Sequence, residues 1–73
     1  MTPLRKIRIK KGMTLSDVVQ RLAKEGEVID TGNLSRIERC IQRPSTTLAE
    51  ALAVVFKNGV NEMHILYPER YMK

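Results

Sequence analysis

The sequence predicts an all-α fold in a single domain, residues 1–73. Three observations support this expectation. A chain of 73 residues can bury one hydrophobic core but not two. Its apolar residues recur at helical spacing and do not alternate as they would in a half-buried strand. Its four glycines and three prolines separate these apolar stripes into short segments, each of which can hold one helix.

The first two helices are expected near residues 3–11 and 15–24. Pro3 suits the first turn of a helix, because the N–H group that proline lacks has no helical partner there. Thr14, with Asp17 three residues later, resembles a capping box at the start of the second helix. The apolar faces of the two segments comprise Leu4 and Ile7, and Leu15, Val18, Val19 and Leu22.

Three further helices are expected near residues 31–40, 46–57 and 61–66, followed by an irregular tail. Each can begin at a side chain that accepts a hydrogen bond from a free backbone N–H: Asp30 or Thr31, Ser45 or Thr46, and Asn61. The apolar faces of the first two of these helices comprise Leu34, Ile37 and Ile41, and Leu48, Ala51, Leu52, Val55 and Phe56.

Charge and cysteine content restrict the partners and the compartment. Thirteen Lys and Arg against eight Asp and Glu leave a net charge of +5, which favours a polyanionic partner, nucleic acid before an anionic membrane. No apolar run approaches the roughly 18 residues of a membrane span. The single cysteine, Cys40, excludes an internal disulfide and a multi-cysteine zinc site. No export signal is recognisable, so a cytoplasmic protein is expected.

Positive charge is segregated along the chain. Residues 1–11 carry five positive charges and no negative one. Residues 36–43 carry three arginines against one glutamate, whereas residues 16–30 carry four acidic residues against two basic ones. A run of charged residues usually lies on a solvent-exposed face that binds no partner. Whether such a run forms a binding surface therefore depends on where its residues fall around the helix.

The segment near 31–40 collects its positive charge on one side. At about 100° per residue, Leu34, Ile37 and Ile41 point inward. The opposite face comprises Gly32, Arg36, Arg39 and Arg43, flanked by Asn33 and Ser35. Arg can donate two parallel hydrogen bonds to guanine and Asn can pair with adenine, so this face has the donors of a major-groove reader. Gly32 either lets the backbone approach DNA or is simply a first-turn glycine.

Several residues occur in a characteristic order. Arg8, Gly12 and Thr14 are followed by NLSRIER at 33–39, by Pro44 and Ser45, and by LAEALA at 48–53. Over residues 4–57 this order resembles the Cro/repressor helix-turn-helix family of phage and bacterial transcriptional regulators. The resemblance implies a compact five-helix domain of the lambda-repressor type. In it, the helices near 15–24 and 31–40 form the helix-turn-helix, and the second of them enters the major groove of DNA.

The resemblance also implies roles for individual residues. The base-reading positions are those of Thr31, Gly32, Asn33 and Arg36. The positions expected on the DNA backbone are those of Thr14, Ser35, Arg39 and Arg43. Family members place an arginine of the first helix against a glutamate of the recognition helix, which implies an ion pair between Arg8 and Glu38.

Two departures from the family pattern carry structural expectations. The stretch 24–30 is about five residues longer than the usual turn, which predicts a longer second helix or a looser loop, with Val28 and Ile29 tucked inward. Cys40 stands where the family usually ends the recognition helix on glycine. Because a left-handed conformation costs a residue other than glycine about 1 kcal/mol, this helix is expected to continue or to end differently.

The tail, residues 61–73, holds more apolar side chains than one short helix needs to cover a core. Ile65, Leu66 and Tyr67 form its densest apolar stretch and are expected at a homodimer interface. His64 is the single histidine and lies among apolar residues, which favours a structural or interface role over catalysis.

The predicted function is that of a sequence-specific regulator, a homodimer that binds a palindromic operator in double-stranded DNA and blocks transcription. Within this class the resemblance implies a small phage or prophage repressor of the Cro type, with an antitoxin or a restriction–modification controller as the alternatives. The alternative from another class is a helical adaptor whose basic face meets an acidic protein. No catalysis, cofactor, metal or small-molecule ligand is expected, because no motif for any of them is present.

Overall fold

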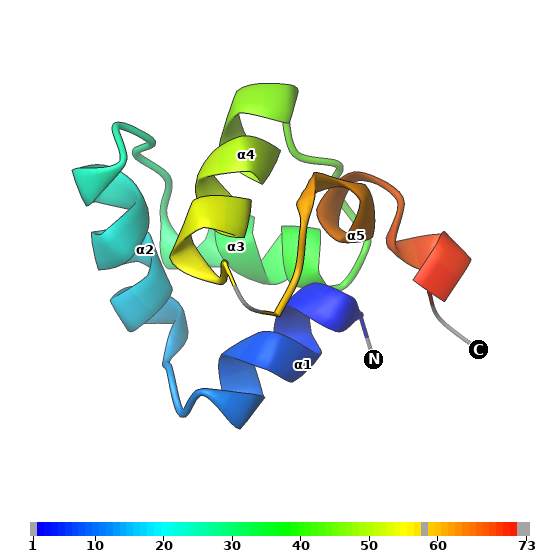
Figure 1. The fold of residues 1–73 in the computed structure, drawn as a ribbon. Helices are drawn as coiled ribbons and strands as arrows, with labels where there is room; N and C mark the ends of the chain where they lie inside the picture. The colour runs from blue at the N-terminus through cyan, green and yellow to red at the C-terminus, as the bar shows by residue number, and fades with distance from the viewer. Residues whose placement is uncertain (1, 58, 72–73) are drawn as a thin grey trace.

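The computed structural model describes residues 2–57 and 59–71 of the chain. These two ranges contain five α-helices and a short 3-10 helix, joined by loops (Figure 1). The elements are α1 (Pro3–Lys10), α2 (Leu15–Lys24), α3 (Thr31–Glu38), α4 (Thr46–Val55), α5 (Glu62–Leu66) and η1 (Pro68–Tyr71). No strand occurs in these two ranges, so the all-α fold class is confirmed. The expected tail contains the 3-10 turn η1, and its residues 72–73 lie outside the described residues.

Local capping accounts for where the helices begin. The side chain before each α-helix accepts a hydrogen bond from a backbone N–H three residues later, which satisfies a donor that has no partner within the helix. The five capping residues are Thr2, Thr14, Asp30, Ser45 and Asn61. His64 completes the last cap, since its Nδ1 accepts from the Asn61 N–H at 3.1 Å, which is a structural role.

Three helices end in the same left-handed turn. Gly12 and Gly26 follow α1 and α2 with φ of 68° and 88°, and Cys40 follows α3 with φ of 62°. After α3, the N–H of Ile41 donates to the carbonyl of Arg36 at 2.9 Å, the bond that closes a Schellman motif. The expectation that Cys40 makes this helix continue or end differently is therefore wrong. The cysteine adopts the conformation that glycine adopts at the other two ends.

One core holds the helices together. Its buried side chains are Leu4, Val18, Leu22, Leu34, Ile37, Leu48, Ala49, Ala51, Leu52, Phe56, Val60 and Ile65. On α3, Leu34 and Ile37 point inward as expected, but Ile41 is 65% exposed. The expectation for Ile41 is wrong because the left-handed turn at Cys40 takes the chain out of the helical period before Ile41 is reached.

The connection between α2 and α3 is a loop rather than an extension of α2. α2 ends at Lys24, and residues 25–30 carry the chain to the Asp30 cap. Ile29 packs against the core as expected, whereas Val28 is 86% exposed, so the expectation that Val28 tucks inward is wrong. The loop is long enough to bury one of these two consecutive side chains while the other faces solvent.

The ion pair expected between Arg8 and Glu38 is present and ties α1 to α3. Arg8 donates from Nε to Glu38 Oε2 at 2.6 Å and from Nη2 to Oε1 at 3.2 Å. The Glu38 side chain is 3% exposed and that of Arg8 is 14% exposed. Two further hydrogen bonds hold these residues in place. Arg8 Nη1 donates to the Met13 carbonyl, and Thr2 Oγ1 donates to the backbone carbonyl of Glu38.

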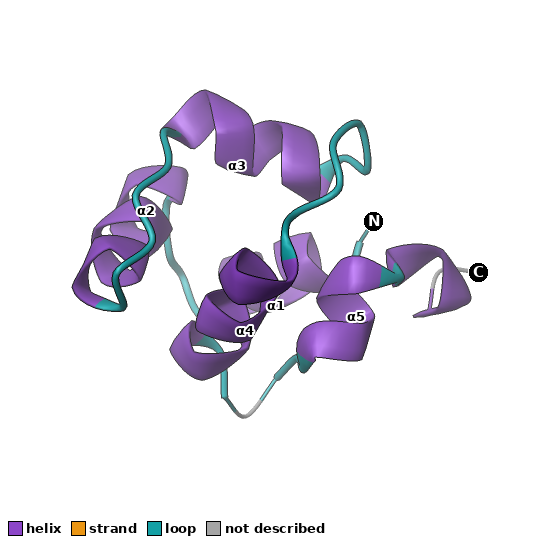
Figure 2. Ribbon diagram, turned by 90° about the horizontal axis from the view of Figure 1, so that it is seen from above, coloured by secondary structure: helices purple, strands orange, loops and turns teal. Residues whose placement is uncertain are grey.

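The arrangement leaves one long side of α3 uncovered. In Figure 2, α3 runs along an outer edge of the molecule, with α2 beside its beginning and α1, α4 and α5 on its inner side.

The described part of the chain contains no helix of the length and apolar character that a membrane crossing requires.

Candidate nucleic-acid interface

The outward face of α3 is formed by four exposed residues. Thr31, Gly32, Arg36 and Arg39 are all exposed, while Leu34, Ile37 and Glu38 fix the other side of the helix in the core. The structure thus brings together three of the four residues expected to read bases and one expected on the DNA backbone.

Gly32 is not required by the fold. A Cβ atom at this position would lie 3.5 Å from Asp30 Oδ1 and 3.6 Å from Arg36 Nη1, which are ordinary contact distances. Its φ is also outside the left-handed range, so the backbone does not need glycine here. Neither space nor backbone conformation therefore demands glycine at this position.

Arg36 spans the exposed face of α3. Its Nη1 lies over Gly32 at the helix start, and its Nε donates to Gln42 Oε1 at 3.3 Å. This bond leaves both terminal nitrogens of the guanidinium available for other acceptors. The sequence offered no signal for Gln42, because the turn at Cys40 is what returns the chain toward Arg36. Gln42 is therefore a contact of Arg36 that sequence reasoning missed.

Asn33 and Ser35 lie at the edge of this face and are half-buried. The side-chain oxygen of Asn33 is buried and has no hydrogen-bond partner among the described residues. Its backbone N–H donates to Asp30 Oδ1 at 2.6 Å, and the Ser35 carbonyl lies 3.5 Å from Arg39 Nε. Both residues are thus less accessible than Arg36, and Asn33 would have to turn outward to present its oxygen to a base.

Arg43 is not part of the α3 face. Its Nη1 donates to the carbonyl of Leu66, and its Nη2 lies 3.5 Å from Glu69 Oε1. The guanidinium also lies over the ring of Tyr67, 5.6 Å from its centre. The arginine expected to hold a phosphate is therefore already engaged by the C-terminal segment.

The start of α2 carries an acidic group. The Thr14 hydroxyl accepts from the Asp17 N–H at 3.0 Å, and Asp17 Oδ2 accepts from the Thr14 N–H at 2.9 Å. The hydrogen bond from the Thr14 backbone, and then that from its hydroxyl, lower the pKa of Asp17 below its usual 3.8. A phosphate approaching Thr14 would meet this ionised carboxylate, and the Thr14 N–H is already donated to it.

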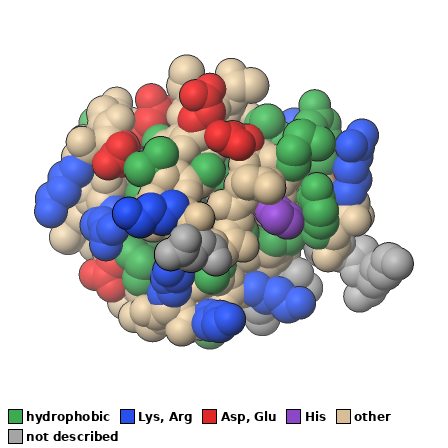
Figure 3. Space-filling view, viewed as in Figure 1, with side chains coloured by type: hydrophobic (Ala, Val, Ile, Leu, Met, Phe, Trp, Pro, Cys, Tyr) green, Lys and Arg blue, Asp and Glu red, His purple; other side chains and the backbone are tan. Residues whose placement is uncertain are grey.

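Basic side chains also gather away from α3. Figure 3 shows the face opposite α3, where Lys and Arg spread over its lower and left parts and acidic residues lie near its top. Lys11, Arg21 and Lys24 line a shallow hollow between the end of α1 and α2, together with one acidic residue, Asp17. Glu25, Glu27 and Glu50 line another hollow beside the exposed Val54. Positive charge is therefore not confined to the face of α3.

The residues expected at a dimer interface are not all accessible. Ile65 is 3% exposed and belongs to the core of the single chain, so its expected place at an interface is wrong. Leu66 is half-buried and packs against the same core. Tyr67 is exposed, as are Met63 and Tyr71 in the same segment. Among the described residues of the C-terminal segment, the exposed large apolar side chains are thus Met63, Tyr67 and Tyr71.

Comparisons with protein-family models, with curated proteins and with solved structures found no match for this chain. Within residues 2–57 and 59–71, no group of three or more His, Cys, Asp or Glu side chains is placed to hold a metal ion.

Proposed function

We propose that this protein is a sequence-specific double-stranded DNA-binding transcriptional regulator, in which α2 and α3 act as a helix-turn-helix and α3 enters the major groove. The observation that supports this most is the free face of α3. Arg36 and Arg39 stand on it beside Gly32, and Leu34, Ile37 and Glu38 hold the opposite side in the core. The likeness to the Cro/repressor family points the same way from sequence motifs alone.

Each residue of the face has a chemical task in this proposal. The terminal nitrogens of Arg36 donate to O6 and N7 of a guanine, while Gln42 holds its Nε. Gly32 lets the helix backbone come close to the base edges, with Thr31 and Asn33 reading beside it. Arg39 and Ser35 donate to the phosphates that flank the groove, and these contacts give affinity without sequence information.

The protein would bind as a homodimer on a palindromic operator and repress transcription by excluding polymerase. A single short helix reads too few bases to select one site in a genome, so doubling the contact is needed. The exposed apolar surface of Met63, Tyr67 and Tyr71 replaces the expected interface of Ile65, Leu66 and Tyr67.

A second candidate function is a protein-interaction adaptor. The hollow that contains Lys11, Arg21 and Lys24 favours it, because these three basic residues outnumber the one acidic residue there, Asp17, and lie off the face of α3, where they could meet an acidic protein. An adaptor of this kind would bind DNA only through charge, without preferring one sequence over another.

Selection of bound duplexes from a random pool tests the proposal. We expect one enriched palindromic sequence, bound more tightly than a scrambled duplex of the same length. Arg36→Ala should weaken binding to the enriched duplex by about 1–3 kcal/mol and relax the preference at one base pair per half-site. Arg21→Ala is the matched control, because it removes the same charge from α2 and should weaken both duplexes alike. Equal binding of all sequences would favour the adaptor.

A further inference from the structure

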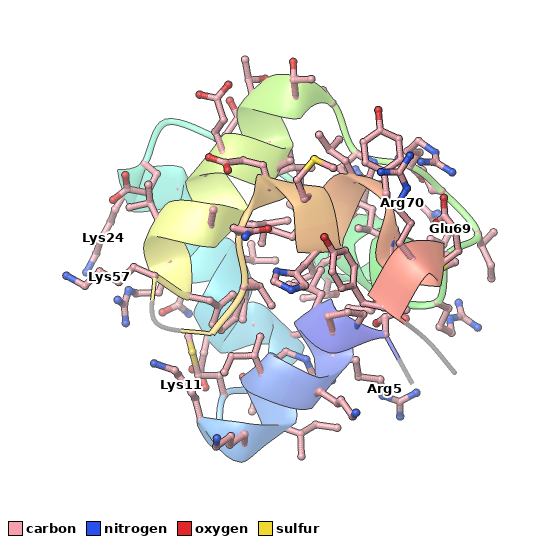
Figure 4. The ribbon with its side chains drawn as sticks, turned by 45° about the vertical axis from the view of Figure 1, so that its right-hand side comes forward. Arg5, Lys11, Lys24, Lys57, Glu69 and Arg70 are labelled. Carbon is pink, nitrogen blue, oxygen red and sulfur yellow. The ribbon has the colours of Figure 1, made fainter. Side chains whose placement is uncertain are left out.

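The loop after α3 and the C-terminal segment meet at Arg43. Arg43 donates from Nη1 to the Leu66 carbonyl, and its Nη2 faces the Glu69 carboxylate at 3.5 Å. In Figure 4, Glu69 and Arg70 project from η1 beside the loop that follows α3. Arg70 lies 4.9 Å from the centre of the Tyr67 ring that Arg43 also covers. Two guanidinium groups therefore share one aromatic ring, and one of them, that of Arg43, also faces the Glu69 carboxylate.

The two contacts of Arg43 differ in how easily another hydrogen-bond acceptor can replace them. The pair with Glu69 is a single interaction between side chains that are 59% and 58% exposed, and exposed ion pairs of this kind are weak. A guanidinium has five N–H donors, so the bond to Leu66 leaves donors free for another anion. A DNA phosphate presents the same kind of oxygen acceptor as a carboxylate, and its binding also releases counterions.

We propose that the Glu69 carboxylate occupies the position on Arg43 that a DNA phosphate takes, while the Leu66 carbonyl keeps the guanidinium in place. This inference rests on the proposed function and adds the regulation of that site. The C-terminal segment competes with DNA for Arg43 and so limits how tightly the loop after α3 holds the duplex backbone. Glu69 therefore affects DNA binding through Arg43, by occupying the guanidinium that the phosphate would otherwise bind.

The test compares two variants that remove one negative charge each. Glu69→Gln frees Arg43, whereas Glu62→Gln removes a carboxylate that is exposed on α5 and forms no ion pair among the described residues. Titration of the selected duplex by fluorescence anisotropy should show Glu69→Gln binding up to about fivefold more tightly than Glu62→Gln, the range that one exposed ion pair spans. Glu69→Asp, which shortens the side chain, should move the affinity in the same direction by less.

Removing Arg43 separates competition from a general effect of charge. In an Arg43→Ala background, Glu69→Gln should lose its advantage over Glu62→Gln, and the dependence of binding on salt should fall by about one phosphate contact. Glu69→Gln that binds no better than Glu62→Gln, with circular dichroism unchanged, overturns the competition while leaving DNA binding intact. Wild-type protein without sequence preference overturns the proposed function instead.

Discussion

Glu38 is a buried charged residue whose contribution to stability comes from its partner. Its carboxylate is 3% exposed and accepts two hydrogen bonds from Arg8. A buried charge without a partner is strongly unfavourable, because the protein interior does not replace the water that the charge has lost.

We therefore expect Glu38→Ala to lower the free energy of unfolding by about 3–5 kcal/mol, since Arg8 is left with an unpaired charge in a largely buried position. Urea denaturation followed by circular dichroism measures this. Glu50→Ala, at an exposed position of α4, is the control and should change stability by less than about 0.5 kcal/mol. Equal losses in the two variants would mean that the ion pair does not stabilise the fold.

Gly32 offers a test in which stability and binding move in opposite directions. Because a Cβ atom fits there at 3.5 Å from its nearest neighbour, Gly32→Ala should raise the free energy of unfolding by up to about 1 kcal/mol. If the backbone approaches DNA at this point, the same methyl group should weaken binding to the selected duplex. A variant that is more stable and binds as tightly as wild type would make Gly32 an ordinary first-turn glycine.

At the scale of the element, the end of α3 is less favourable than the ends of α1 and α2. The same left-handed turn is made by glycine at positions 12 and 26 and by cysteine at position 40. A side chain in this conformation approaches the following carbonyl oxygen too closely, which costs about 1–2 kcal/mol.

Cys40→Gly should therefore stabilise the protein by about 1 kcal/mol, after the greater flexibility of glycine in the unfolded chain has offset part of the gain. Cys40→Ala keeps the Cβ atom and serves as the control, with a change close to zero. Thermal unfolding in a reducing buffer measures both. A Cys40→Gly variant no more stable than Cys40→Ala would show that the left-handed turn is not strained.

At the scale of the whole molecule, the C-terminal segment both closes the core and offers surface. Ile65 is buried, while Met63, Tyr67 and Tyr71 remain exposed. An interface made of so few side chains would bury little area, so we expect weak dimers that DNA brings together.

Tyr67→Asp should reduce self-association, because it replaces an exposed aromatic ring, which the partner would cover, with a charged side chain. Sedimentation equilibrium of the free protein over a range of concentrations measures the effect, because a new carboxylate beside Arg43 and Arg70 would by itself alter DNA binding. Val28→Asp is the control, since Val28 is 86% exposed on the loop between α2 and α3 and should leave association unchanged. A folded Tyr67→Asp protein that associates like wild type would move the interface to another surface.

Much of the fold could be predicted from the sequence because its signals are local. A capping side chain and the N–H it accepts from are three residues apart, and an apolar stripe is set by spacings of three and four. These signals placed all five helices and the inward side of α3. The ion pair of Arg8 and Glu38, 30 residues apart, came from a family motif rather than from local spacing.

The features that only the tertiary structure decided occur at two kinds of place. They occur where the chain leaves the helical period, and where a side chain meets a segment that is distant in the sequence. Val28 and Ile41 are exposed because loop geometry, not helical spacing, sets their direction. Arg43 is engaged by Leu66, 23 residues away, and no pattern along the chain marks that contact. The sequence by itself thus determined where the helices form and which side of each is apolar. Folding determined which polar side chains are left free, because burial depends on the packing of all segments at once.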